Sequence, residues 1–394
     1  MESLKELYRI GSGPSSSHTM GPEKASKYIL NNYKDANRFV VFLYGSLALT
    51  GKGHLTDYII KKTLGENRTT INFDYQEKMP HPNTFKVEIY KDEALIDTVY
   101  FTSIGGGEIL INGKKNKEVS TPYDFKDFKE ICDYAKENNI GLEEVVYRFE
   151  DKDIKEYLKK VYETMVESIK RGLSKDGYLP GSLNVKRKAK QIYDALNEDS
   201  LRDKVIAYAY AVSEENASGN KIVTSPTCGS SGVLPACLYY YENKGYSIDK
   251  IIDALAVAGL IGTTIKENAS ISGAYLGCQA EVGTACSMAA GALSYLEGGS
   301  FEMIDCAAEI AMEHHLGLTC DPVDGLVQIP CIERNAVAAL RAIDACKMSL
   351  LPIYPEKITF DSVIKTMLET GKDIRENYKE TSKGGLALSK IKRE

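Results

Sequence analysis

Three cysteines in the last third of the chain lie beside turn-forming residues. Cys278 follows Gly277, Cys320 stands in the run TCDP, and Cys331 follows Pro330. Cysteines in such turns can direct their sulfur atoms toward one point, whereas cysteines inside apolar helices normally only pack. A fold in which the three turns meet would therefore place three thiols in one site.

Two interpretations of this pattern remain open on spacing alone. Cys286 and Cys306 lie in apolar, helix-like runs and are expected to pack. No C-x-x-C pair of the kind used by structural zinc sites is present. An iron–sulfur cluster normally takes four thiolates, so three would leave one iron open as a Lewis acid. Three buried, inert thiols fit the same spacing, because free cysteine is among the most buried residue types.

Long runs around these cysteines resemble the alpha domain of the iron–sulfur-dependent L-serine dehydratases. These runs are NASISGAYLGCQAEVGTACSMAAG and AMEHHLGLTCDPVDGLVQIPCIERNAVAA. Four earlier runs, GSGPSSSHTMGPEKA, GSLALTGKGHLTD, MPHPNTF and SIGGGE, are similar to the beta domain of that family. The resemblance extends from Gly11 to about Asn335 and implies a single chain that carries both domains.

The resemblance also implies roles for individual residues. Cys278, Cys320 and Cys331 are expected to hold a [4Fe–4S] cluster whose fourth iron binds the substrate hydroxyl. His54 is expected to take the Cα proton, with His18 as the second choice and Lys266 as a fallback. Loss of water would give aminoacrylate, which becomes pyruvate and ammonia. The residues expected to bind the substrate are Ser15, Ser16, Ser17, Thr19, His81, Asn83 and Thr227.

The residues themselves supply the parts that such a reaction needs. His18, His54 and His81 fall in glycine-, serine- or proline-rich loops of the N-terminal region, which suggests a shared site. An unperturbed histidine has a pKa of about 6.5, so a histidine base predicts activity that falls below about pH 6.5. Hydroxyl-rich loops precede helices near Pro22 and Leu234, and helix N-termini bind anions, although a plain N-cap is the commoner meaning. No lysine stands in a phosphate-cradling context, so a pyridoxal mechanism is not favoured.

The hydrophobic pattern predicts an α+β protein. A small mixed α/β domain over residues 1–120 is indicated by the alternation of Phe85, Val87 and Ile89, which is typical of a half-buried strand, with residues 94–101 as its hairpin partner. Residues 121–153 are rich in lysine and glutamate and are expected to connect the domains. Residues 154–394 follow the helical period and predict a larger, all-helical domain that binds the cluster.

Composition excludes several classes of function. The net charge of −6 argues against a nucleic-acid surface. No apolar run approaches the roughly 20 residues of a membrane span, and the N-terminus lacks a signal-peptide core. Nine cysteines without such a signal predict a cytoplasmic protein. The expected partner is L-serine, and we expect a homodimer, although the sequence pattern leaves the oligomeric state open.

The chain departs from part of its family at the C-terminus. Some members end in a cysteine that can ligate the fourth iron, whereas here the last cysteine is Cys346 and the chain ends at Glu394. An open iron would face solvent and be sensitive to oxygen. The tail from Asn377 is basic and is expected to be mobile. Two alternatives remain: a related lyase acting on L-threonine or L-cysteine, and a non-catalytic iron–sulfur sensor.

Overall fold

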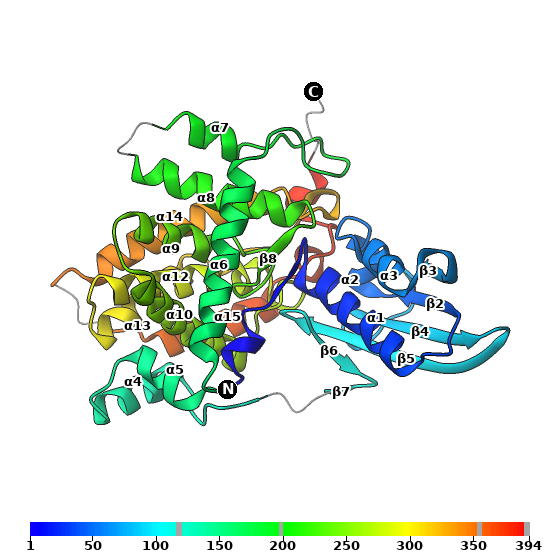
Figure 1. Ribbon diagram of the computed structural model, residues 1–394, viewed down its shortest axis with the longest axis horizontal. Helices are drawn as coiled ribbons and strands as arrows, with labels where there is room; N and C mark the ends of the chain where they lie inside the picture. Colours follow the sequence, from blue (N-terminus) through cyan, green and yellow to red (C-terminus); the bar gives the residue numbers. More distant parts are fainter. Residues whose placement is uncertain (116–119, 197–199, 353–356, 390–394) are drawn as a thin grey trace.

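The computed structural model describes residues 1–115, 120–196, 200–352 and 357–389. A smaller part built on a β-sheet lies beside a larger helical part, and the C-terminal segment lies where they meet (Figure 1). The predicted α+β class is confirmed. The predicted domain limits at residues 120 and 153 remain a prediction.

A mixed sheet forms the smaller part, in the strand order β3-β2-β4-β5-β6-β7. Strands β2 and β3 run parallel, and the other neighbours are antiparallel. The expected hairpin is confirmed, because β4 and β5 pair across Lys91 and Ala94. The strands are β2 (Arg38–Leu43), β3 (Thr69–Phe73), β4 (Thr84–Lys91), β5 (Ala94–Gly105), β6 (Glu108–Ile111) and β7 (Lys114–Lys115).

One face of this sheet is apolar because alternate residues of each strand point to the same side. Phe85, Val87 and Ile89 of β4 are buried there, as the alternation predicted. Helices α1 (Gly21–Asn32) and α3 (Thr56–Leu64) cover this face and contribute Ile29 and Ile60 to its core. The short helices that precede them, η2 (Ser16–Met20) and α2 (Gly45–Thr50), carry residues of the candidate site.

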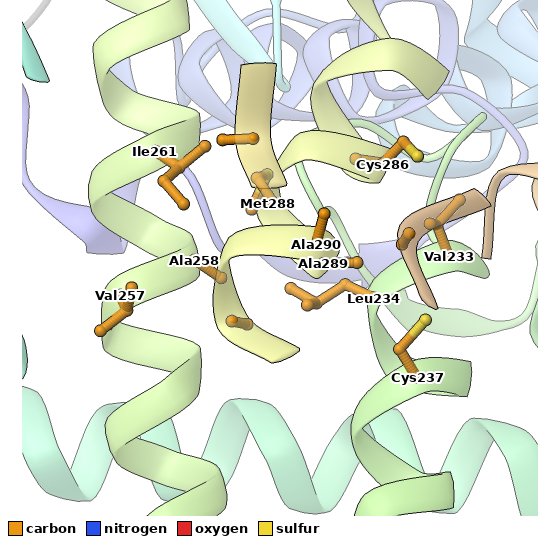
Figure 2. Close-up of a cluster of buried hydrophobic side chains, with 14 of the residues drawn as sticks. Val233, Leu234, Cys237, Val257, Ala258, Ile261, Cys286, Met288, Ala289 and Ala290 are labelled. Carbon is orange, nitrogen blue, oxygen red and sulfur yellow. The ribbon is translucent and has the colours of Figure 1, made fainter. Parts of the chain in front are cut away.

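Apolar helices form the core of the larger part. Helix α12 (Val282–Leu296) packs against α9 (Val233–Asn243), α10 (Ile248–Asn268), α13 (Phe301–Glu313) and α14 (Cys331–Ser349). Figure 2 shows Cys237 and Cys286 among the aliphatic side chains of this core. The prediction that Cys286 and Cys306 lie inside buried helices is confirmed. The remaining α-helices are α4 (Phe128–Glu137), α5 (Leu142–Phe149), α6 (Ile154–Leu173), α7 (Ala189–Asp194), α8 (Leu201–Ala217), α11 (Gly273–Leu276) and α15 (Phe360–Asp373).

The N-terminal segment packs against the helical part before the chain enters the sheet. Leu4 and Leu7 are buried in the core of the helical part, and β1 (Ile10–Ser12) pairs with β8 (Lys221–Val223). Residues 121–153 also pack on this core through Phe128 of α4 and the apolar face of α5. Short 3₁₀ helices include η4 (Cys278–Ala280), η5 (Val323–Gly325), η6 (Glu376–Tyr378) and η7 (Gly385–Leu388). In the part of the chain described, no helix is both long enough and apolar enough to cross a membrane.

Candidate active site

Three thiols from separate chain segments line one cavity. Cys278, Cys320 and Cys331 all form part of its wall, and its space, open mouth included, is about 420 Å³. The three turns therefore meet, as the sequence pattern allowed. The other polar residues that line the cavity are Ser15, His54, Glu281, Asp321, Arg334 and Glu380.

Gly277 lets the backbone of Cys278 approach the turn that carries Cys320. Its φ of 81° lies in the left-handed region. A Cβ atom at this position would stand 2.7 Å from the carbonyl oxygen of Leu318. The backbone N–H of Gln279 donates to that same oxygen at 3.2 Å. Only glycine adopts this positive φ and leaves room for the Leu318 carbonyl without strain. Gly277 therefore holds the Cys278 thiol beside the Cys320 thiol.

Arg334 ties the segment of Cys331 to the turn of Cys320. It lies one helical turn after Cys331 on α14. Its guanidinium group donates to the carbonyl oxygen of Thr319 at 2.6 Å and to Oδ1 of Asp321 at 3.1 Å. Because these two acceptors flank Cys320, charge-assisted hydrogen bonds hold two of the thiol-bearing segments together.

The three thiols differ in how readily they ionise. Contact with the Cys320 thiol lowers the pKa of Cys278, and the Arg334 guanidinium lowers it further, while burial opposes both. The same contact with Cys278, together with burial, raises the pKa of Cys320 well above its usual range. Burial likewise raises the pKa of Cys331. Since the thiolate is the form that binds metals, Cys278 is the thiol best prepared to do so.

His54 faces the cavity from the turn between α2 and α3. Its Nδ1 lies 3.1 Å from the carbonyl oxygen of Thr50, which can only accept, so Nδ1 carries the hydrogen and Nε2 keeps a lone pair. The turn lies in close contact with the helical part. A Cβ atom at Gly53 would stand 2.5 Å from the carbonyl oxygen of Gly325. The Thr19 hydroxyl donates to the His54 carbonyl at 2.7 Å and fixes the turn further.

His18 lies in the π-helical turn η2 rather than in the expected loop. Its Nε2 lies 3.1 Å from Oγ of Ser46 and 3.0 Å from Oγ1 of Thr50. The Thr50 hydroxyl donates to the Ser46 carbonyl, and the Ser46 hydroxyl donates to the Glu380 carbonyl. Both hydroxyl oxygens must therefore accept from His18, which places its hydrogen on Nε2 and its lone pair on Nδ1.

Burial keeps both histidines neutral. It lowers the pKa of His54 to about 4. It also lowers the pKa of His18 well below the usual value, with a further contribution from the neighbouring His54. The two rings lie 4.5 Å apart, and their residues are 0% and 1% exposed. The expectation of an ordinary loop-histidine pKa is therefore wrong, because folding removes both rings from water.

Glu380 reaches the cavity from the C-terminal segment, and sequence analysis did not single it out. Its Oε1 lies 3.7 Å from Nδ1 of His18 and 3.7 Å from Nε2 of His54. Burial raises the pKa of its carboxyl group well above the usual range, and the nearby Glu281 and Cys278 raise it further. A buried acid thus stands between the thiols and the two imidazole rings.

Backbone hydrogen bonds hold this segment against the Cys320 turn. The hydrogen bonds given next contradict the expectation that the tail from Asn377 is mobile, as far as Ser389. The last five residues of the chain lie outside the part that the structure describes. The Glu380 N–H donates to the Cys320 carbonyl at 2.7 Å. The further contacts join Cys320 N to Tyr378 O at 2.8 Å, Ser382 Oγ to Pro322 O at 2.7 Å, and Leu386 N to Asp321 Oδ2 at 2.8 Å.

Four of the residues expected to bind substrate are buried at or near the cavity, and of these four Ser15 is the one in its lining. Ser15 lines it, and its Oγ lies 3.3 Å from Oγ of Ser17. Ser16 is buried between them in the same segment. Thr227 is buried near Glu281, where burial raises the pKa of the Glu281 carboxyl group and a hydrogen bond with Thr227 opposes that shift.

The three other expected residues, like Ser16, Ser17 and Thr227, lie outside the cavity lining. The Thr19 hydroxyl is used by the His54 backbone. His81 accepts a hydrogen bond at Nδ1 from the Asn83 N–H at 3.1 Å. Among the residues described, the buried side-chain amide of Asn83 has no hydrogen-bond partner. Substrate-binding roles for all seven expected residues remain predictions.

Lys266, the fallback base, is used by ion pairs at the junction of the two parts. Its Nζ lies 2.6 Å from Glu2 and 3.7 Å from Glu108, and it does not line the cavity. The side chain is therefore held by carboxylates away from the thiols, and the structure favours the two histidines over Lys266 as candidate bases.

Two sets of donor atoms could hold a metal. One is the set of three thiols, and soft thiolates suit iron–sulfur clusters. The other consists of His18, His54 and Glu380, whose ligand atoms all lie within 4.8 Å of one another. The second set mixes nitrogen and oxygen donors, which suit zinc or iron as single ions rather than a cluster.

Comparison with known protein families shows which family the chain belongs to. The family model described as serine dehydratase alpha chain matches residues 52–387, which is more than half of the chain, and that described as serine dehydratase beta chain matches residues 3–65. The chain belongs to the serine dehydratase family. Its relatives in that family match it over nearly their whole length.

Among these relatives, L-serine dehydratase 1 of Escherichia coli (strain K12) is 40% identical over 98% of this chain and 99% of its own length. L-serine dehydratase of Haemophilus influenzae is 39% identical, with 98% and 99% covered. L-serine dehydratase of Helicobacter pylori (strain ATCC 700392 / 26695) is 40% identical, with 98% of each chain covered.

For this member of the serine dehydratase family, sequence analysis missed four charged residues of the cavity, one of which is Asp321, directly after Cys320. Glu281 lies three residues after Cys278, and Arg334 lies three residues after Cys331. Nearness to a candidate ligand could have identified both. Glu380 offers no such sequence signal, because it stands in a basic tail far from the other site residues along the chain.

Proposed function

We propose that this chain converts L-serine to pyruvate and ammonia as an L-serine ammonia-lyase. The observation that carries the proposal is the shared cavity of three thiols and the lone-pair nitrogen of His54. Dehydration of serine needs an electrophile for the hydroxyl group and a base for the Cα proton, and this cavity offers residues for both. The printed names of the relatives support serine as the substrate.

The thiols of Cys278, Cys320 and Cys331 fit an iron–sulfur cluster. They come from three segments that Gly277 and Arg334 hold together, and Cys278 has a lowered pKa that favours the metal-binding thiolate. A [4Fe–4S] cluster held by these three thiolates would supply a Lewis-acidic iron for the substrate hydroxyl.

His54 is the proposed base. Its hydrogen bond from Nδ1 to the Thr50 carbonyl fixes the tautomer, so Nε2 is the atom that accepts the Cα proton. Its pKa of about 4 keeps the ring neutral at physiological pH. His18, whose Nε2–H is held by Ser46 and Thr50, supports the site as a neutral neighbour.

Polar groups at the N-terminus of η2 are proposed to bind the substrate carboxylate. Ser15 lines the cavity, and the hydroxyl of Ser17 is linked to it. The Ser15 side chain also accepts from the His18 N–H at 3.1 Å as the cap of this turn. Hydroxyls and backbone N–H groups at such a helix start favour an anion. Loss of water then leaves aminoacrylate, which tautomerises and hydrolyses to pyruvate and ammonia.

A cytoplasmic location and a homodimer complete the proposal. All nine cysteines are free thiols in the structure, and free thiols persist in the reducing cytoplasm. Light scattering on the purified protein would test the dimer, and a mass near that of one chain would contradict it.

The test is an assay of protein prepared without oxygen. Iron, sulfide and pyruvate formation from L-serine are measured on the same sample, with L-threonine and L-cysteine as competing substrates. We expect about four irons per chain and the highest kcat/KM for L-serine. Preference for L-threonine or L-cysteine would indicate a related lyase. Iron without turnover of any of the three would favour a non-catalytic sensor and contradict the proposed function.

A further inference from the structure

The carboxyl group of Glu380 has no role in the function proposed above, although it stands beside the base. The C-terminal segment carries it into the cavity, where its backbone is held from both sides. The Glu380 N–H donates to the Cys320 carbonyl at 2.7 Å, and its carbonyl accepts from the Ser46 hydroxyl at 2.8 Å. Glu380 therefore bridges the thiol-bearing part and the histidine-bearing part.

The hydrogen bonds of the two histidines define what faces this carboxyl group. His54 has its hydrogen on Nδ1, toward Thr50, and His18 has its hydrogen on Nε2, toward Ser46 and Thr50. The remaining nitrogen of each ring carries a lone pair and lies 3.7 Å from Oε1 of Glu380, but the Ser17 hydroxyl already donates to Nδ1 of His18 at 2.9 Å. The lone pair on Nε2 of His54 can therefore share a proton with Oε1 of Glu380, which suits a protonated carboxyl group at this position.

Dehydration of serine moves two protons rather than one. The base removes the Cα proton, and the departing hydroxyl group needs a proton to leave as water. One group could perform both transfers in turn, but a second proton carrier beside the base lets removal of the Cα proton and protonation of the hydroxyl group occur together. Glu380 lines the same cavity as the thiols and lies next to Nε2 of His54.

We propose that Glu380 is a catalytic acid that protonates the departing hydroxyl group and recovers its proton from His54. In this step the Cα–H electron pair forms the second bond between Cα and Cβ. The C–O bond breaks with its electron pair on oxygen, and the Glu380 proton goes to that oxygen. Transfer from Nε2 of His54 to Oε1 then restores both groups, and no co-reactant is needed. The inference rests on the proposed function.

Glu281 is the other glutamate that lines the cavity, and its surroundings do not suit this role. It bonds with Thr227, and Cβ atoms built on Gly229 and Gly273 would stand 3.3 Å and 2.5 Å from its carboxylate oxygens. These neighbours place its carboxyl group on the side of the helical part. Glu380, in contrast, lies within 4.0 Å of both imidazole rings.

The test compares two substrates that differ in their leaving group. L-Serine loses hydroxide, which needs a proton, whereas β-chloro-L-alanine loses chloride, which does not. Full-length wild type, Glu380→Gln and the control Glu376→Gln are prepared without oxygen. Glu376 is an exposed glutamate of the same segment, so its replacement makes the same Glu-to-Gln change outside the cavity. Iron per chain and the visible absorbance are recorded for each protein before kinetics.

We expect Glu380→Gln to keep its iron and its KM for L-serine within about threefold. Its kcat for L-serine should fall by at least about 100-fold, the lower end of general acid–base effects, and its kcat for β-chloro-L-alanine by less than about threefold. Equal losses on both substrates, or loss of iron, would make Glu380 a structural support and overturn the inference. Unchanged turnover of L-serine would overturn it as well.

A second variant decides the matter if the wild type does not accept the chloride substrate. Glu380→Gly leaves a space that formic acid can enter, and restored turnover of L-serine with added formate would support an acid at this position. No restoration would overturn the inference. Failure of the proposed function is a separate outcome, because wild type and Glu376→Gln would then form no pyruvate from L-serine.

Discussion

Two groups of cysteines in this chain, all buried except the half-buried Cys331, differ in their surroundings. Cys278, Cys320 and Cys331 stand at turns or helix starts and line one cavity, whereas Cys237 and Cys286 lie inside helices of the apolar core (Figure 2). The core thiols donate to backbone carbonyls of α14, at 3.5 Å for Cys237 and 3.2 Å for Cys286. Burial alone therefore does not distinguish a metal ligand from a packing residue.

Charge and chain geometry make the distinction. Burial raises the pKa of Cys286 well above its usual range. The Cys278 thiol has a lowered pKa, because the Cys320 thiol contacts it and Arg334 stands nearby. Glycine and proline beside the cavity thiols allow close approach of separate segments, which a helix interior does not permit.

The largest expected effect comes from replacing the cavity thiols. Cys278→Ser, Cys320→Ser and Cys331→Ser should each lose the cluster and with it essentially all pyruvate formation, because three ligands leave no spare thiolate. Cys286→Ser and Cys306→Ser, which alter buried helix residues, should keep about four irons per chain. Iron analysis of the five anaerobic proteins checks this. Equal loss of iron in all five would remove the distinction between the two groups.

The next effect separates the base from the thiols. His54→Ala should keep its iron and lose turnover of L-serine by roughly two to four orders of magnitude, the usual contribution of general acid–base catalysis. His314→Ala is a matched control, because the His314 side chain is 50% exposed and outside the cavity. Steady-state kinetics with iron analysis provide the measurement. Normal turnover in His54→Ala together with an inactive His18→Ala would assign the base to His18.

A smaller effect concerns pH. A lowered histidine pKa favours the neutral ring, so protonation that abolishes the base moves to lower pH. With a pKa of about 4, His54 stays neutral at pH 5.5, whereas at an ordinary pKa of about 6.5 roughly one-tenth would be neutral. We expect kcat/KM at pH 5.5 within about threefold of its value at pH 7.5. A tenfold loss, with an acid limb centred near pH 6.5, would mean that the ring is not buried in the working enzyme.

The sequence predicted the parts of this site that depend on local chain chemistry. Turn residues beside Cys278, Cys320 and Cys331 indicated thiols at element ends, and alternation predicted β4. Contacts between distant segments could not be predicted in the same way. The 3.7 Å approach of Glu380 to His54 depends on the path of the C-terminal segment across the Cys320 turn, which no periodicity specifies.

For the histidines, the sequence predicted their positions but not their ionisation. Their loops were visible in the sequence, and His18 and His54 do meet, with rings 4.5 Å apart. Their low pKa was not predictable, because it arises from desolvation that only the assembled fold imposes. His81 lies in a similar loop and stays outside the cavity lining, so loop composition alone did not separate the three.

The smallest expected effect tests the core thiols by stability. In Cys286→Ser, an oxygen replaces a larger sulfur that is fully buried and donates to the Ala338 carbonyl at 3.2 Å. The shorter C–O bond places the hydroxyl farther from that carbonyl and leaves space among the aliphatic side chains. We expect a loss of about 1–2 kcal/mol in the free energy of unfolding, as is typical of a buried substitution. Urea unfolding of the anaerobic protein measures it. A much larger loss accompanied by loss of iron would place Cys286 with the cavity thiols, whereas the predicted small loss with iron retained shows that a buried cysteine in a helix interior serves packing alone.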